Sequence, residues 1–338
     1  MGGDKIRVLI TGCAGLIGAN LSKFLLDKGY TVIGIDNLSG AYRENVDDRV
    51  IFYESDLGDH VSTADIFEKE RPTHVYHLAA YAAEGLSPYI RRFNYLNNVI
   101  CSVNVINACI NTGVKKIIFT SSMAVYGVGT PPFTEEQPLT PEDPYGIAKY
   151  AIEMDLKLAH DHFSLAYSIV RPHNIVGIYQ NIWDRYRNVI GIWIRQSMRG
   201  DPLTIFGDGT QIRAFSDIKF CMKPFEQLLY EHDGETFNIG ADQEWTINDA
   251  AKVVQKVAAE FGNHVDIRWL EQRNEVHTAY CDHNKAKKLL NFVDNTVFET
   301  TVREMYKWAM SEPDRQVKSL KYEVEKNMYN FWAASPAE

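Results

Sequence analysis

The first half of the chain alternates short apolar runs with longer segments in which apolar residues recur every three or four positions. The short runs are typical of buried strands, and the longer segments are typical of helices that cover a sheet. This alternation predicts a parallel, doubly wound α/β sheet. The expected strands are Lys5–Thr11, Thr31–Ile35, Val50–Tyr53, His74–Ala80, Lys115–Thr120 and Leu165–Val170, and the expected helices are Ala19–Lys28, Ala64–Glu70, Asn94–Thr112 and Tyr145–Phe163.

The pattern changes after Arg171, where loops and aromatic side chains become frequent. We therefore expect a first domain over residues 1–172, which can regain short segments from the second half. Residues 173–338 are expected to form a smaller, interleaved α/β lid over the carboxyl ends of the strands. Its expected helices lie within 215–229, at 246–261, near Lys285 and at 300–310, followed by an amphipathic helix and a loose tail in 313–338.

Composition excludes several classes of function. The 338 residues are 45% hydrophobic and 23% charged, which is ordinary for a soluble globular protein. The net charge of -9 argues against a nucleic-acid partner, and no apolar run approaches the ~20 residues of a membrane span. The five cysteines show neither paired nor metal-ligand spacing, which predicts reduced thiols, no metal site and a cytoplasmic location.

A glycine-rich segment follows the first expected strand and opens the first helix. Its glycines are Gly12, Gly15 and Gly18, and Leu16 and Ile17 lie between the last two. Glycines at such a turn let the backbone approach a pyrophosphate at a helix N-terminus. The spacing differs from the usual G-x-G-x-x-G, but its place between a strand and a helix favours dinucleotide binding.

The second strand leads to Asp36, close to the expected distance after the glycines. A carboxylate there accepts hydrogen bonds from a ribose 2′-hydroxyl and repels a 2′-phosphate. Residues 37–41 contain no Arg or Lys to bind that phosphate, so the expected cofactor is NAD rather than NADP. Asp56 is placed either to meet an adenine edge or to cap a helix, and Leu78-Ala79-Ala80 suits close approach of the backbone to a ligand.

Tyr145 and Lys149 stand four residues apart and share one face of the last predicted helix. A phenol is a poor base at neutral pH, but a nearby ammonium group lowers its pKa. The pair could therefore take a proton from a hydroxyl group. Ser122 follows the fifth strand and could hold the same hydroxyl.

Together these segments resemble the extended short-chain dehydrogenase/reductase family, the nucleotide-sugar epimerases and dehydratases. The resemblance runs from Val8 to about Trp308 and implies a Rossmann-type fold with NAD and a nucleotide-diphosphate sugar as ligands. The matching segments are TGCAGLIG (11–18), Asp36-Asn37-Leu38, Asp56-Leu57, HLAA (77–80), SSMAVYG (121–127), YGIAK (145–149), RPHNIVG (171–177), FGDGTQIRAF (206–215) and Arg273 to Lys285.

The resemblance also assigns roles to single residues. Tyr145 would remove the O4 proton of the sugar while C4 gives hydride to NAD, Ser122 would orient O4, and Lys149 would hold the nicotinamide ribose. Arg213 and Arg273 would clamp the diphosphate. Further cofactor contacts are expected from Asn37 and Leu57, in addition to the glycine-rich segment, Asp36, Asp56 and residues 78–80. Further substrate contacts are expected from Asn174 and from Arg187, which lies in a basic, aromatic loop.

Met123 and Ala124 narrow the choice of reaction. Dehydratases of this family carry an acid/base pair there, and decarboxylases and 3,5-epimerases use Glu or Cys at the position of Ala124. The remaining chemistry is oxidation and reduction at C4, which favours a 4-epimerase that acts through a 4-keto sugar. A 4-dehydrogenase or reductase, a 3,5-epimerase and a non-catalytic NAD-binding scaffold remain alternatives.

A homodimer is expected from helices 94–112 and 145–163, which carry more apolar residues than one sheet-facing side requires. These residues are Val99, Ile100, Val103, Ile106, Tyr150, Ile152, Met154 and Leu156.

Overall fold

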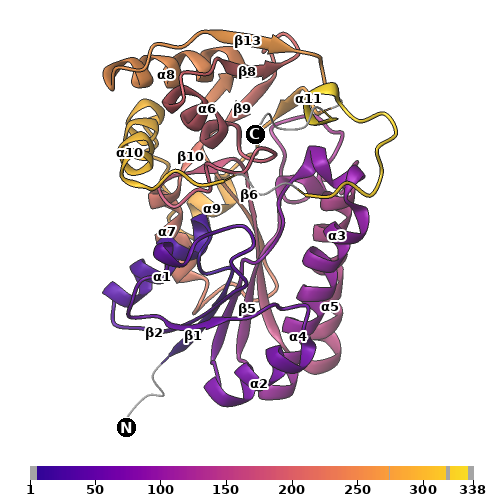
Figure 1. The fold of residues 1–338 in the computed structure, drawn as a ribbon. Coiled ribbons are helices and arrows are strands. Elements are labelled where there is room, and N and C mark those ends of the chain that lie inside the picture. The colour runs from indigo at the N-terminus through magenta and orange to yellow at the C-terminus, as the bar shows by residue number, and fades with distance from the viewer. Residues whose placement is uncertain (1–5, 274, 317–319, 334–338) are drawn as a thin grey trace.

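A sheet of seven parallel strands forms the centre of the computed structural model, which describes residues 6–273, 275–316 and 320–333 (Figure 1). The strand order is β3-β2-β1-β4-β5-β6-β11, so the expected doubly wound sheet is confirmed. The order reverses between β1 and β4, and ligands of such sheets bind beyond the strand ends at this point. The strands are β1 (Arg7–Thr11), β2 (Thr31–Asp36), β3 (Ile51–Glu54), β4 (His74–His77), β5 (Lys116–Thr120), β6 (Ala166–Pro172) and β11 (Thr236–Ile239).

Helices cover both faces of the sheet, each through its own apolar cluster (Figure 1). Helices α1 (Leu16–Asp27), α7 (Ile218–Gln227) and α9 (Asn284–Leu289) pack on one face. Helices α2 (His60–Glu70), α4 (Cys101–Thr112) and α5 (Pro144–Phe163) pack on the other. Both β11 and α7 come from the second half of the sequence, so the two halves are interleaved.

The helix expected over 94–112 begins earlier and is not regular. It consists of α3 (Arg91–Tyr95), the π-helical turn η3 (Leu96–Ile100) and α4. The other sheet and helix boundaries lie within a few residues of expectation, except that α2 begins at His60 and β4 ends at His77. Lys5, the expected start of the first strand, lies outside the described residues.

The lid has a third apolar cluster, built around the fully buried Trp193. Its longer elements are α6 (Val189–Met198), β8 (Leu203–Phe206), α8 (Ile247–Glu260), β13 (Ile267–Leu270) and α10 (Phe298–Ser311). The short elements of the chain are β7 (Ile175–Val176), β9 (Ile212–Ala214), β10 (Ser216–Asp217), β12 (Glu244–Thr246), β14 (Thr278–Ala279), η1 (Arg43–Asn45), η2 (Glu84–Tyr89) and η4 (Met123–Val125).

The expectation of an amphipathic helix in 313–338 is wrong for the part that the structure describes, 313–316 and 320–333. There only α11 (Asn330–Ala333) is helical. The segment instead crosses back to the first domain, where the Glu323 carboxylate accepts hydrogen bonds from the Arg92 and Phe93 amides at 2.6 and 2.8 Å. Docking of this carboxylate at the start of α3 holds the chain end against the first domain (Figure 1).

The five cysteines are buried free thiols. Among the described helices, none has the length and apolar character needed to cross a membrane.

Candidate active site

Two hollows lie beyond the carboxyl ends of the strands and share part of their walls. We call them the Asp36 groove and the Tyr145 cleft, after a residue that lines each. Both are lined by Gly12, Gly15, Gly40, Leu78, Ala80 and Arg187, so they form one continuous path. A ligand with two linked parts, such as a dinucleotide, fits a path of this form.

The glycine turn shapes the point where the hollows meet. Gly12 has φ +69°, and a Cβ there would lie 2.9 Å from the Ala79 backbone. A Cβ at Gly18 would lie 2.2 Å from the Gly12 carbonyl oxygen, so α1 could not pack so close to the turn with a larger residue. Gly15 is the N-cap of α1 and offers no side-chain cap, and the first turn has no acidic residue. The free N–H groups therefore suit a pyrophosphate.

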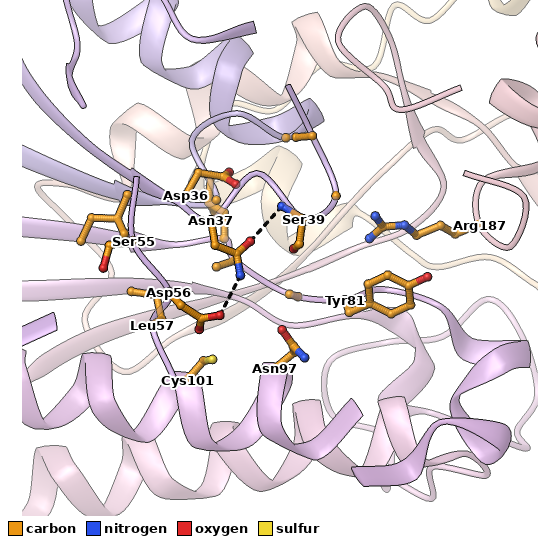
Figure 2. Close-up of a pocket in the computed structure, with 18 residues that line it drawn as sticks. Asp36, Asn37, Ser39, Ser55, Asp56, Leu57, Tyr81, Asn97, Cys101 and Arg187 are labelled. Atoms are coloured by element: carbon orange, nitrogen blue, oxygen red, sulfur yellow. Dashed lines mark hydrogen bonds between the residues drawn. The ribbon is translucent and has the colours of Figure 1, made fainter. Parts of the chain in front are cut away.

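Carboxylates line the Asp36 groove (Figure 2), and backbone amides hold them in place. Asp36 accepts hydrogen bonds from the Ala14 and Leu38 amides at 3.0 and 2.8 Å, and burial raises its pKa. Asn37 donates to Asp56 at 3.1 Å. Leu57, Leu78, Ala79 and Ala80 also line the groove, so every residue expected to contact the adenosine part of NAD lies here.

A buried chain of hydrogen bonds fixes the loop after β4. The Thr11 hydroxyl accepts from the Leu78 and Ala79 amides at 3.1 and 3.2 Å, so its own proton is free to point to His77 Nδ1, 2.8 Å away. His77 Nε2 then lies 2.8 Å from the Ser102 hydroxyl, which donates to the Asn98 carbonyl. This chain requires a neutral imidazole, and burial lowers the His77 pKa to about 3.

Arg187 lies at the boundary between the two hollows rather than only beside a sugar site. It comes from the lid, and its guanidinium stands 4.4 Å from the Tyr81 ring centroid and 2.6 Å from the Asp184 carboxylate (Figure 2). The absence of Arg and Lys from residues 37–41 therefore did not exclude a cation at the groove. The sequence did not predict Arg187 at the groove, because the lid loop that carries it reaches the groove only through the tertiary fold.

Ser122, Tyr145 and Lys149 all line the Tyr145 cleft and are all buried. Asp143 caps α5 by accepting from the Tyr145 and Gly146 amides at 2.8 and 3.0 Å, which fixes the helix start. Lys149 Nζ donates to the Thr120 carbonyl at 2.7 Å and lies 5.8 Å from the Tyr145 ring centroid. The structure thus brings together the three residues that the sequence singled out.

The electrostatics of this trio differ from expectation in one respect. Burial, and then the Glu84 carboxylate, raise the Tyr145 pKa, while the Ser122 hydroxyl opposes the rise. Burial also lowers the Lys149 pKa to about 7, so this lysine is a weaker source of positive charge than a solvated one. The predicted lowering of the phenol pKa is therefore not produced by the chain's own groups alone.

The predicted diphosphate residues also line the Tyr145 cleft. Arg213 Nη2 and Arg273 Nη2 lie 3.3 and 3.6 Å from the same Glu275 carboxylate oxygen, and the Arg273 guanidinium stacks 3.9 Å from the Phe206 ring centroid. Asn174 Nδ2 is buried and has no hydrogen-bond partner among the described residues. A buried donor without an acceptor is costly, so the cleft has the polarity of a ligand site.

Residues 8–240 match the model of the NAD dependent epimerase/dehydratase family. The chain belongs to this family. It is therefore an NAD-dependent enzyme, and the cofactor predicted from the glycine turn and Asp36 is confirmed.

The similarity to known proteins extends over nearly the whole chain. A UDP-glucose 4-epimerase of Bacillus subtilis is 29% identical to this chain, and the aligned region covers 90% of this chain and 97% of the relative. The crystal structure of a Thermotoga maritima UDP-glucose 4-epimerase with UDP-glucose has a TM-score of 0.84 at 30% identity, covering 90% of this chain and 99% of its own. The crystal structure of a Bacillus cereus UDP-glucuronic acid 4-epimerase with UDP-glucuronic acid and NAD has a TM-score of 0.81 at 27% identity. This match covers 90% of this chain and 99% of the other.

Two features of the Tyr145 cleft escaped the sequence analysis. Glu84 lines it from η2, which packs against α5, and no spacing pattern marked this carboxylate. Tyr329, Phe331 and Trp332 line it from the chain end. Their signal was present in the run Met328-Tyr-Asn-Phe-Trp332, because a solvated tail rarely carries so many aromatic residues.

Proposed function

We propose that this chain is an NAD-dependent 4-epimerase of a nucleotide-diphosphate sugar, and that the nucleotide is UDP. The observation that carries the proposal is the Tyr145 cleft, where Ser122, Tyr145 and Lys149 lie with Met123 and Ala124. The last two side chains cannot transfer protons, which argues against a dehydratase. Several relatives are named UDP-sugar 4-epimerases, which supports both the reaction and the nucleotide.

In this proposal each side chain has a defined task. Tyr145 Oη takes the proton of the C4 hydroxyl, and the Ser122 hydroxyl holds the same oxygen. Arg213 and Arg273 bind the diphosphate, whose charge matches their guanidinium groups, and Asn174 Nδ2 donates to it. NAD, when bound, accepts the C4 hydride and supplies a positive charge that favours the phenolate. Lys149 binds the nicotinamide ribose.

The cofactor contacts follow the continuous path. Asp36 accepts from the adenosine ribose, Asp56 and Asn37 face the adenine, and Leu57 and residues 78–80 form the apolar wall. The N-terminus of α1, with Gly12, Gly15 and Gly18 beside Leu16 and Ile17, receives the pyrophosphate. We assign Arg187 to this pyrophosphate region, because it lines both hollows.

The proposal includes a homodimer and a cytoplasmic location, the latter supported by the buried free thiols. Ile106, Ile152 and Leu156, which we had expected at the dimer interface, are buried in the core. The exposed apolar residues on the same helices form stripes, namely Leu96, Ile100, Ile147, Met154 and Leu158, of which Ile100 and Met154 had been expected at the interface. Two copies can bury these stripes in an isologous contact. A monomeric mass by light scattering at micromolar concentration would refute it.

Incubation of purified protein with UDP-sugars, read by NMR, tests the proposed reaction. The expected product is the C4 epimer, formed without added cofactor if NAD is retained. Accumulation of NADH with release of a keto sugar would favour the 4-dehydrogenase. Absence of any turnover with bound NAD would favour the non-catalytic scaffold.

A further inference from the structure

Glu84 opens the short helix η2, which packs against the start of the catalytic helix. The Ser87 hydroxyl accepts from the Tyr145 amide at 3.3 Å and lies 3.2 Å from the Asp143 carboxylate. It also lies 2.8 Å from the Glu84 carbonyl. These contacts fix the backbone of Glu84 relative to the first turn of α5. The Glu84 side chain is exposed to the Tyr145 cleft rather than packed away from it.

The neighbours of Glu84 show which part of the cleft it occupies. Helix η2 packs against α5, which carries Tyr145, and a Cβ on the adjacent Gly85 would lie 3.9 Å from Arg273 Nη1. On one side, Glu84 raises the Tyr145 pKa more than any other charged group does. On the other, Arg213 and Arg273 act on the Glu84 carboxyl. In the proposed function, C4 lies at Tyr145 and the diphosphate at the two arginines. The hexose ring that joins them must therefore pass beside Glu84.

The Glu84 carboxylate has no hydrogen bond or ion pair with any residue in the described ranges. Each carboxylate oxygen can accept more than one hydrogen bond, so both remain available to a ligand. Its neighbours Asp143 and Glu275 are also acidic. The two nearby arginines already share Glu275 and would also meet the diphosphate. Arg185, Arg187 and Lys149 also line the cleft, but none of them is among the charges that act most strongly on Glu84.

We propose that Glu84 selects the sugar: it accepts hydrogen bonds from the hydroxyl groups of a neutral hexose and excludes uronic acids. This inference rests on the proposed function and specifies its substrate class. It separates two kinds of relative, since UDP-glucose and UDP-glucuronate 4-epimerases both resemble the chain. A sugar carboxylate beside Glu84 would place two negative charges together after loss of water, which is costly.

The selection should depend on pH. The walls of the cleft restrict the hydration of the Glu84 carboxyl. This effect, together with Asp143 and Glu275, raises the pKa of Glu84 to about 7, against the opposing effect of Arg213 and Arg273. A raised pKa means that Glu84 becomes neutral as the pH falls below about 7. The neutral acid neither repels a sugar carboxylate nor accepts as strongly from hydroxyl groups. Discrimination against a uronic acid should therefore be strongest above pH 8 and weaken towards pH 6.

The test compares UDP-glucose and UDP-glucuronate with the NAD-bound enzyme, the Glu84→Gln variant and the control Glu136→Gln. Glu136 is an exposed carboxylate outside the cleft lining, so its variant removes the same charge elsewhere. For the wild type at pH 8 we expect kcat/KM to favour UDP-glucose by about 10²-fold, the scale of a like-charge penalty. Glu84→Gln should reduce this ratio by about tenfold or more through a gain with UDP-glucuronate, and Glu136→Gln should leave it unchanged.

Binding of the two nucleotide sugars by calorimetry separates this proposal from the proposed function. If neither is epimerised, the 4-epimerase proposal fails, yet tighter binding of UDP-glucose that Glu84→Gln abolishes would still support Glu84 as the selecting residue. Equal or preferred binding of UDP-glucuronate by the wild type would overturn it. The selecting role of Glu84 would also be overturned if Glu84→Gln left the affinity ratio unchanged, or if neither nucleotide sugar bound.

Discussion

The Asp36 groove and the Tyr145 cleft hold similar polar groups but differ in whether those groups already have partners. In the groove, the carboxylates of Asp36 and Asp56 accept from backbone amides of nearby residues. In the cleft, Asn174 Nδ2, Arg273 Nε and the hydroxyls of Thr120 and Ser121 are buried without a hydrogen-bond partner among the described residues. The groove is thus shaped by its own backbone, whereas the cleft has buried polar atoms that no described residue pairs with.

This difference predicts how the two hollows respond to mutation. Changes in the groove should alter cofactor affinity and leave the chemistry intact once NAD is bound. Changes to the cleft residues assigned to the sugar, such as Ser122 and Tyr145, should alter turnover and leave cofactor affinity intact. A variant that lowered cofactor affinity and turnover of the NAD-bound enzyme equally would contradict this difference between the two hollows.

The largest expected effect follows Tyr145→Phe. Loss of the phenol removes the proposed base, so kcat should fall by at least ~10²-fold, the scale of general-base catalysis. NAD should stay bound, as measured by absorbance of the released cofactor. Tyr150→Phe, on the same helix but outside the cleft lining, is the matched control and should stay close to wild type. Near-normal turnover of Tyr145→Phe would refute the assignment of the base.

A smaller effect is expected for Asp36→Ala. The variant loses an acceptor for the ribose hydroxyls, so NAD affinity should fall by about tenfold, and discrimination against NADP should relax. Titration of both cofactors measures this. The control is Asp27→Ala, which removes an exposed carboxylate at the far end of α1. Unchanged affinity and selectivity would show that the ribose does not lie at Asp36.

The smallest expected effect is on stability, and it involves the two buried histidines His77 and His173. Burial lowers the pKa values of His77 and His173 to about 3. Their pKa is thus depressed relative to the unfolded chain, which binds more protons than the folded protein below pH 6.5. Each histidine should therefore cost about 0.7 kcal/mol of stability between pH 7 and pH 6, and more at lower pH.

Urea unfolding at pH 7 and pH 6 checks this prediction. His77→Gln should be less stable at both pH values, because it disturbs the hydrogen bonds to Thr11 and Ser102, but it should lose less stability on acidification. Equal losses of stability on acidification in the wild type and in His77→Gln would contradict the neutral buried state of His77.

The sequence predicted the Asp36 groove better than the Tyr145 cleft, for a physical reason. The groove is assembled mainly from residues 12–101, whose strand, turn and helix signals are local. Arg187, in contrast, comes from the lid. The cleft gathers Glu84, Tyr145, Asn174, Arg213 and Arg273, which only the tertiary fold brings together.

Two outcomes show the same limit. Arg187 was expected near the sugar from its basic, aromatic loop. It lines the Tyr145 cleft, but the Asp184 ion pair and the Tyr81 ring also bring it to the Asp36 groove. The chain end was expected to be a helix and a loose tail. Its described part docks on α3 through Glu323, a contact between segments that are far apart in the sequence.

The most direct test of the proposed reaction is epimerisation in deuterium oxide. If hydride leaves C4 and returns to it within the Tyr145 cleft, the carbon-bound hydrogen never exchanges with water. The epimerised UDP-sugar should then contain no carbon-bound deuterium by mass spectrometry and NMR. Deuterium at C3 or C5 would contradict the 4-epimerase and favour the 3,5-epimerase, since it would require a group in the cleft to remove a proton from carbon.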